Sequence, residues 1–95
     1  MSLRMACEHW DVRFVGHVQG VGFRYSTVGI ARGFEVSGTV ENLPDGSVRM
    51  TVEGQAEELR SFLGEIQRAF DGHIRETLVD RLPASGAFTG FTIRH

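Results

Sequence analysis

Apolar and polar side chains alternate with a period of two along residues 10–18. Successive side chains of a β-strand point to opposite faces of the sheet, so this alternation predicts a strand with one buried face. Val15 is the one apolar residue that falls on the polar side. The apolar members are Trp10, Val12, Phe14 and Val18, and the polar members are Asp11, Arg13 and His17.

Two later segments carry the spacing of an amphipathic helix instead. In the first, apolar residues recur every three or four positions from Phe23 to Phe34, and in the second they do so over residues 55–70. The dipeptide Asp71-Gly72 ends the second segment. Its apolar positions are Ala56, Leu59, Phe62, Leu63, Ile66 and Phe70, and its polar positions include Glu57, Glu58, Arg60, Glu65 and Arg68. Each segment therefore predicts a helix with one buried stripe.

The remaining patterned segments predict strands. Residues 36–43 and 47–53 predict a hairpin, because Pro44-Asp45-Gly46 between them tolerates a tight turn. Residues 74–82 and 91–94 follow the second helix and complete the pattern. The order is strand, helix, strand, strand, helix, strand, plus an edge strand. It predicts an α+β fold, the ferredoxin-like split βαβ sandwich, with two helices on one face of a four- to five-stranded, mainly antiparallel sheet.

The length of 95 residues accommodates one small domain. We expect residues 1–8 to form a flexible N-terminal segment and residues 9–95 to form that domain. Cys7 is the only cysteine, so no intrachain disulfide can form and a reducing compartment is expected. The chain has no apolar run of membrane-spanning length and no signal-peptide pattern. These features predict a cytoplasmic protein with no membrane partner, and a monomer is the default expectation.

The segment Gly16-His17-Val18-Gln19-Gly20-Val21-Gly22-Phe23-Arg24 connects the first strand to the first helix. Glycine takes positive φ values and lets a ligand approach the backbone, and the first N–H groups of a helix lack intrahelical partners. The helix dipole and the Arg24 guanidinium add positive charge at the same point. The sequence therefore predicts an anion site, best suited to a phosphoryl group. Its residues are Gln19, Gly20, Val21, Gly22, Phe23 and Arg24.

Two other glycine-rich phosphate loops do not match this segment. A dinucleotide-binding fingerprint requires a third glycine where this chain has Tyr25, and a Walker loop requires Gly-Lys-Ser/Thr. All ten basic residues are arginine, so the chain has no lysine. A plain strand-to-helix turn, in which the glycines serve only chain geometry, is the remaining alternative.

Asn42 lies near the end of the predicted strand 36–43. Alternation places it on the same side as Val36, Gly38 and Val40, which is the inward side. A buried amide without partners costs about 1–3 kcal/mol. Asn42 is therefore expected either to bond the backbone of the hairpin or to face a wet cleft.

The strings GHVQGVGFR and GTVENLPDGSV resemble the acylphosphatase family, whose members carry a Gly-x-Val-Gln-Gly-Val-x-Phe-Arg loop and a later Gly-x-Val-x-Asn strand. The resemblance runs to the closing Phe91-Thr92-Ile93-Arg94. It implies a hydrolase that converts small-molecule acyl phosphates to carboxylate and inorganic phosphate, without a cofactor, a metal or a covalent intermediate. It also implies that Arg24 clamps the phosphoryl group and that Asn42 orients the attacking water.

Two residues depart from the pattern of this family. Thr39 stands where an aromatic residue is common, and Glu41 stands where a basic residue is common. Both lie on the opposite side of their strand from Asn42, so only modest repulsion of an anionic substrate is expected.

The histidines form no ligand-like cluster in the sequence, and we expect no metal site. They are His9, His17, His73 and His95. His9 and His17 fall on the polar side of the first strand, so we expect both to face solvent.

Two other classes of function remain open. A non-catalytic phosphate- or anion-binding module would need the same loop, although Asn42 favours catalysis. An RNA-binding domain is the second alternative, because sheets of this topology often stack bases on exposed aromatics. Val48, Met50 and Val52 of the central strand offer no such platform, and the net charge of −2 argues against a nucleic-acid partner.

Domains that resemble acylphosphatases also occur in larger carbamoyl-transfer and hydrogenase-maturation proteins. This chain ends with its last predicted strand, so we expect no fused partner. The exclusive use of arginine indicates a GC-rich bacterial genome.

Overall fold

The computed structural model describes residues 7–95, and its elements follow the predicted order. They are β1 (Cys7–Gly16), α1 (Phe23–Ala31), β2 (Val36–Asn42), β3 (Val48–Gln55), α2 (Ala56–Ala69), β4 (Ile74–Pro83) and β5 (Phe91–Ile93). Most of the segment predicted to be flexible, residues 1–8, lies outside the described residues. Cys7 and Glu8 belong to β1, so this strand begins before the predicted domain boundary at residue 9.

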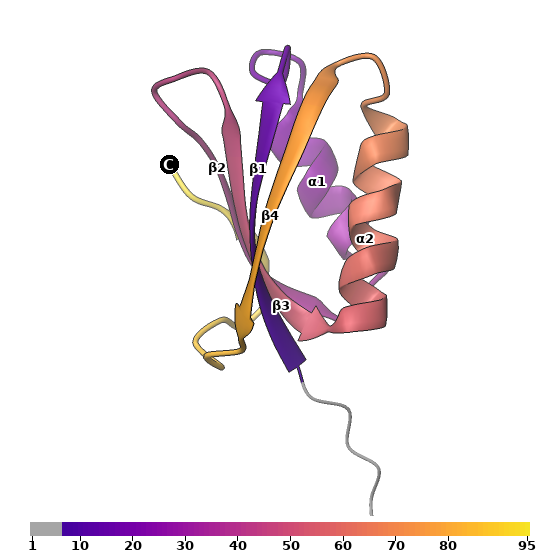
Figure 1. Ribbon diagram of the computed structural model, residues 1–95, viewed down its shortest axis with the longest axis vertical. Coiled ribbons are helices and arrows are strands. Elements are labelled where there is room, and N and C mark those ends of the chain that lie inside the picture. Colours follow the sequence, from indigo (N-terminus) through magenta and orange to yellow (C-terminus); the bar gives the residue numbers. More distant parts are fainter. Residues whose placement is uncertain (1–6) are drawn as a thin grey trace, which may run out of the picture.

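The five strands form one sheet in the order β4-β1-β3-β2-β5. All neighbours are antiparallel except β2 and β5, which run parallel. Both helices cover one face of this sheet, and the other face is left open (Figure 1). The predicted ferredoxin-like sandwich is confirmed, with five strands in a mainly antiparallel arrangement.

The core lies between the sheet and the helices. Trp10, Val12 and Phe14 of β1 are buried opposite Val52, Met50 and Val48 of β3, respectively. The alternation in residues 10–18 therefore reports the inner face correctly, although β1 itself ends at Gly16. From α2, the buried side chains are Leu59, Phe62 and Ile66. Burial of each such side chain stabilises the fold by about 1.5–3 kcal/mol.

An aromatic cluster fixes the start of α1. The Phe23 ring packs against Phe14 of β1, with centroids 4.9 Å apart, and against Phe70 after α2, with centroids 4.5 Å apart. Phe23 is 2% exposed. The first turn of α1 is therefore held against both the sheet and α2, and the backbone that carries Arg24 has a fixed position.

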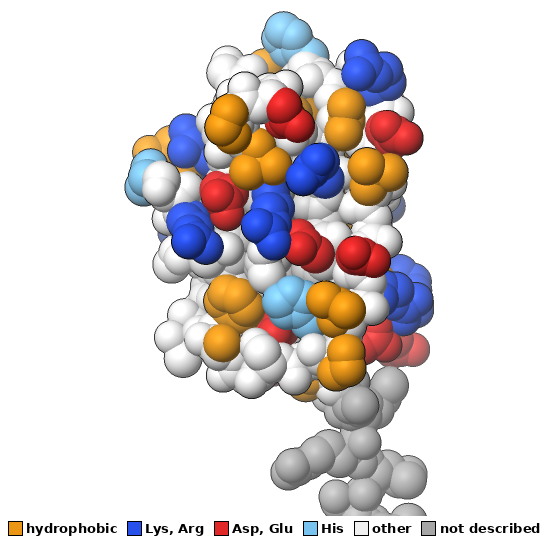
Figure 2. Space-filling view, turned by 60° about the vertical axis from the view of Figure 1, so that its left-hand side comes forward, with side chains coloured by type: hydrophobic (Ala, Val, Ile, Leu, Met, Phe, Trp, Pro, Cys, Tyr) orange, Lys and Arg blue, Asp and Glu red, His pale blue; other side chains and the backbone are white. Residues whose placement is uncertain are grey.

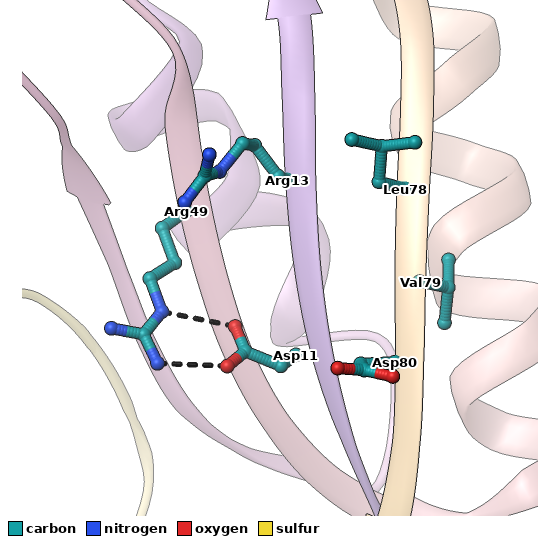
Figure 3. Close-up of a pocket in the computed structure, with 6 residues that line it drawn as sticks. All are labelled: Asp11, Arg13, Arg49, Leu78, Val79 and Asp80. Carbon is teal, nitrogen blue, oxygen red and sulfur yellow. Dashed lines mark hydrogen bonds and ion pairs between the residues drawn. The ribbon is translucent and has the colours of Figure 1, made fainter. Parts of the chain in front are cut away.

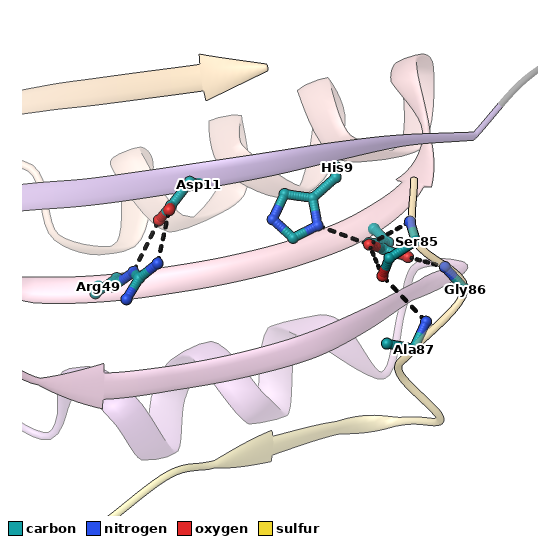
Figure 4. Close-up of polar contacts among 7 residues, drawn as sticks. His9, Asp11, Arg49, Ser85, Gly86 and Ala87 are labelled. Carbon is teal, nitrogen blue, oxygen red and sulfur yellow. Dashed lines mark hydrogen bonds and ion pairs between the residues drawn. The ribbon is translucent and has the colours of Figure 1, made fainter. Parts of the chain in front are cut away.

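Glu53 on the open face of β3 is a buried carboxylate, 5% exposed. It accepts hydrogen bonds from His9 Nδ1 at 2.6 Å, Ser85 N at 2.9 Å, Ser85 Oγ at 2.7 Å and Gly86 N at 2.9 Å (Figure 4). The prediction that His9 faces solvent is wrong. Its imidazole is held by Glu53, which lies directly opposite on the neighbouring strand. The carboxylate thus ties the connection between β4 and β5 to the sheet.

These hydrogen bonds make Glu53 sensitive to acid. Burial alone raises the pKa of this carboxyl, but the hydrogen bonds from His9, Ser85 and Gly86 outweigh it and lower the pKa from 4.5 to about 2. A depressed pKa contributes stability above the ordinary value of 4.5, and this contribution is lost as the pH falls from 4.5 towards 2.

We therefore expect Glu53→Gln to lower the free energy of unfolding at pH 7 by about 2–3 kcal/mol. The variant should also lose less stability than the wild type between pH 5 and pH 2. Urea denaturation at several pH values measures both effects. Glu76→Gln is the matched control, because the Glu76 side chain is exposed and makes no hydrogen bond within residues 7–95. An unchanged acid dependence in the Glu53 variant would contradict this account.

The open face of the sheet mixes charges of both signs with apolar side chains (Figure 2). Arg49 of β3 donates to both carboxylate oxygens of Asp11 on β1, at 2.9 and 2.7 Å, and this contact lowers the pKa of Asp11. Val48, Met50 and Val52 of β3, considered above as a platform for bases, face the helices and not the open face. The outward residues of this strand are Arg49, Thr51 and Glu53. They likewise offer no aromatic platform.

Candidate functional site

The glycine loop between β1 and α1 has the backbone conformation that only glycine adopts easily. Gly20 and Gly22 both have φ of +78°. Gly22 is the N-cap of α1 in the left-handed region, and no side chain caps this helix. Any other residue at either position would be strained. The loop therefore presents bare backbone at the start of the helix.

The backbone N–H groups of residues 19–25 donate no hydrogen bond within residues 7–95. The first donor of the helix is Ser26 N, which bonds Gly22 O at 3.0 Å. Seven consecutive N–H groups thus have no internal partner within residues 7–95, and the dipole of α1 gives this end a partial positive charge. Such a cluster of unengaged donors suits an anion.

Arg24, the second residue of α1, is half-buried. Within residues 7–95 it forms no ion pair and no side-chain hydrogen bond. Arg49, Arg68 and Arg81, by contrast, each bind a carboxylate. The charge of Arg24 is therefore not compensated by a neighbouring acid within the described residues.

Gln19 joins the loop to the β2–β3 hairpin. Its Nε2 donates to Leu43 O at 2.8 Å and to Ser47 O at 2.9 Å. Sequence reasoning assigned Gln19 only a backbone contribution and missed this bridge. No local pattern could have revealed it, because the two acceptors are carbonyls from a distant part of the sequence. The bridge holds the loop directly against the residue that follows Asn42.

Asn42, the last residue of β2, pairs with Val48 and lies on the side of the sheet that the helices cover. It is half-buried, and its side chain makes no hydrogen bond within residues 7–95. The adjacent hairpin is closed by other groups, since Asp45 Oδ1 accepts from Ser47 N at 2.9 Å and from Ser47 Oγ at 2.6 Å. The hairpin-capping alternative is therefore not supported, and the amide of Asn42 is available to a ligand or a water.

Thr39 and Glu41 lie on the open face, as expected, because they pair with Thr51 and Arg49 of β3.

A hollow of about 580 Å³ on that face is lined by Asp11, Arg13, Arg49, Leu78, Val79 and Asp80 (Figure 3). It contains none of the predicted site residues. The glycine loop and the end of β2 instead lie together at one end of the sheet (Figure 1).

Removal of the Gln19 bridge should cost stability. We expect Gln19→Ala to lower the free energy of unfolding by about 1–3 kcal/mol, because the carbonyls of Leu43 and Ser47 lose their side-chain donor. Urea denaturation measures the change. Gln67→Ala is the control, since Gln67 is exposed and makes one long contact of 3.4 Å with Thr77. Equal stability of both variants would argue against a structural bridge.

Within residues 7–95, no three His, Cys, Asp or Glu side chains lie close enough to hold a metal ion by themselves. Neither of the two helices described has the length and apolar character that a membrane crossing requires.

Comparison with known proteins identifies the family of this chain. A family model described as acylphosphatase matches residues 10–93. An acylphosphatase of Salinibacter ruber is 42% identical over 85 residues, which cover 88% of this chain and 90% of the relative. An acylphosphatase of Listeria welshimeri is 47% identical over 64 residues, which cover 67% of this chain and 69% of the relative. The crystal structure of acylphosphatase from Bacillus subtilis matches with a TM-score of 0.85 at 28% identity, over 93% of this chain and 99% of that one. On this evidence, the chain belongs to the acylphosphatase family.

Proposed function

We propose that this chain hydrolyses acyl phosphates, R–CO–O–PO₃²⁻, to a carboxylate and inorganic phosphate, and is thus a hydrolase acting on acid anhydrides that contain phosphorus. The observation that carries the proposal is the row of unengaged N–H groups at residues 19–25 beside the uncompensated Arg24. Family membership supports the same reaction.

The phosphoryl group is bound by the backbone of the loop. Its equatorial oxygens accept hydrogen bonds from N–H groups of Gln19 to Arg24, and the planar guanidinium of Arg24 binds two of these oxygens. Charge on the phosphoryl oxygens is thereby stabilised by donors that are already in place before the substrate arrives. Since carboxylate is a good leaving group, positioning and electrostatic stabilisation supply most of the catalysis.

Asn42 orients the attacking water. Its amide makes no hydrogen bond within residues 7–95, and Gln19 holds the adjoining hairpin against the loop that binds phosphate. The amide oxygen accepts a hydrogen bond from the water and aims it in line with the leaving carboxylate. No cofactor enters this scheme, and the proton of the water passes to the phosphate of the substrate.

The unengaged amide of Asn42 also favours catalysis over binding alone. A non-catalytic module would need the loop and Arg24 but would have no use for a positioned carboxamide. We further propose that the protein acts as a monomer in a bacterial cytoplasm on a small-molecule substrate. The single cysteine, Cys7, is exposed and agrees with a reducing compartment.

Steady-state hydrolysis of benzoyl phosphate in the presence of EDTA tests the proposal. We expect turnover that EDTA does not diminish and that inorganic phosphate inhibits competitively. Phosphate binding without turnover would instead assign the chain to the non-catalytic class. A requirement for added metal would overturn the metal-free scheme.

A further inference from the structure

His17 and His73 lie side by side at the end of the sheet that carries the glycine loop. Their ring centroids are 6.1 Å apart, and the ring planes are inclined by 41°. Both side chains are exposed. One belongs to the segment after β1 and the other to the turn before β4, so the sequence gives no sign of their proximity.

The backbones that carry these two rings are fixed relative to each other. His17 N donates to His73 O at 2.9 Å, and His73 N donates to Phe70 O at 2.9 Å. The close approach requires Gly16, because a Cβ at this position would lie 2.3 Å from His73 O. The Phe70 ring also packs edge-on to His73, with centroids 6.2 Å apart. Only side-chain rotation is therefore needed to bring the two imidazoles to a common ligand.

We propose that His17 and His73 form a two-histidine binding site for a transition-metal dication of the Zn²⁺, Ni²⁺ and Cu²⁺ class. Neutral imidazole nitrogens bind these ions at about 2.0–2.1 Å and are among their preferred protein ligands. Since no third protein ligand lies close by within residues 7–95, water fills the other coordination positions and the affinity is modest. The site is independent of the proposed hydrolysis.

Three other His and Cys side chains in the described residues could bind such ions, and each can be told apart from the His17–His73 pair. The Nδ1 atom of His9 already contacts Glu53 at 2.6 Å. His95 lies after β5 and is exposed. Cys7 is an exposed thiol that would bind the same metals. A Cys7→Ser background therefore removes the main competitor without touching the pair.

Calorimetric titration of the untagged Cys7→Ser protein with Ni²⁺ tests the site. We expect one Ni²⁺ per chain, at least about tenfold weaker binding in His17→Ala and in His73→Ala, and unchanged binding in His95→Ala. Replacing both histidines should weaken binding no further than replacing one. A single remaining imidazole cannot chelate the ion, so either substitution alone already abolishes the site. Retained affinity in both single variants, or loss of affinity in His95→Ala, would overturn the proposal.

A second measurement covers the case in which a variant does not fold. Substoichiometric Cu²⁺ added to the Cys7→Ser protein should broaden the imidazole NMR signals of His17 and His73 before those of His9 and His95. Selective broadening of His9 or His95 instead would contradict the site.

Discussion

Replacement of Arg24 by glutamine is expected to lower kcat/KM for benzoyl phosphate by about 10³-fold or more and to weaken inhibition by phosphate. Arg24 is the charged member of the proposed phosphoryl site, and within residues 7–95 no carboxylate competes for it. Phe23, not Arg24, anchors the helix in the core. The variant should therefore keep the wild-type fold, which circular dichroism and urea denaturation check.

Two further variants sharpen this experiment. Arg24→Lys should restore little activity, because an ammonium group provides one point charge where the guanidinium provides a planar pair of donors. Arg32→Gln is the matched control, since Arg32 is exposed at the other end of α1 and forms no ion pair within residues 7–95. Near-normal turnover by Arg24→Gln, or an equal loss in Arg32→Gln, would remove Arg24 from the site.

The fold was predictable because its signals are local. A period of two in residues 10–18 marks a strand with one face against the helices, and Trp10, Val12 and Phe14 are indeed buried. The loop was predictable for the same reason, because glycine is the residue that most easily takes positive φ, and Gly20 and Gly22 both do so. Each inference depends on neighbouring residues along the chain.

Contacts across strands were not predictable from the same patterns. His9 was expected in solvent because alternation places it on the open face, yet that face holds the buried carboxylate of Glu53 directly opposite. The bridge of Gln19 and the pairing of His17 with His73 depend equally on the register between distant segments. The period of the pattern predicts which face of the sheet a residue occupies. The register between strands determines which side chain lies opposite it.

The sequence also could not show whether the loop N–H groups have internal hydrogen-bond partners. A glycine-rich turn can pair its N–H groups internally or leave them unpaired, and the same glycines suit both cases. In this chain the donors of residues 19–25 make no internal hydrogen bond within the described part. This arrangement is the one that the proposed anion site requires.

Asn42→Ala is expected to lower kcat by about 10²–10³-fold while phosphate inhibition stays nearly unchanged. Phosphate binds to the loop and Arg24, which the substitution leaves intact. The water that Asn42 orients contributes mainly to the transition state, so its loss affects kcat more than ground-state binding. Steady-state kinetics with benzoyl phosphate, together with the inhibition constant of phosphate, measure both quantities.

Thr39→Ala provides the matched control for Asn42→Ala. Thr39 belongs to the same strand but points to the open face, opposite Thr51, so its truncation should leave kcat within about twofold, as expected for a residue outside the reacting centre. The fold should survive the Asn42 substitution, because the hairpin is closed by Asp45 and Gln19 rather than by Asn42. If phosphate inhibition weakened as much as kcat fell, Asn42 would be a phosphate ligand and the attacking water would have to be oriented by another group.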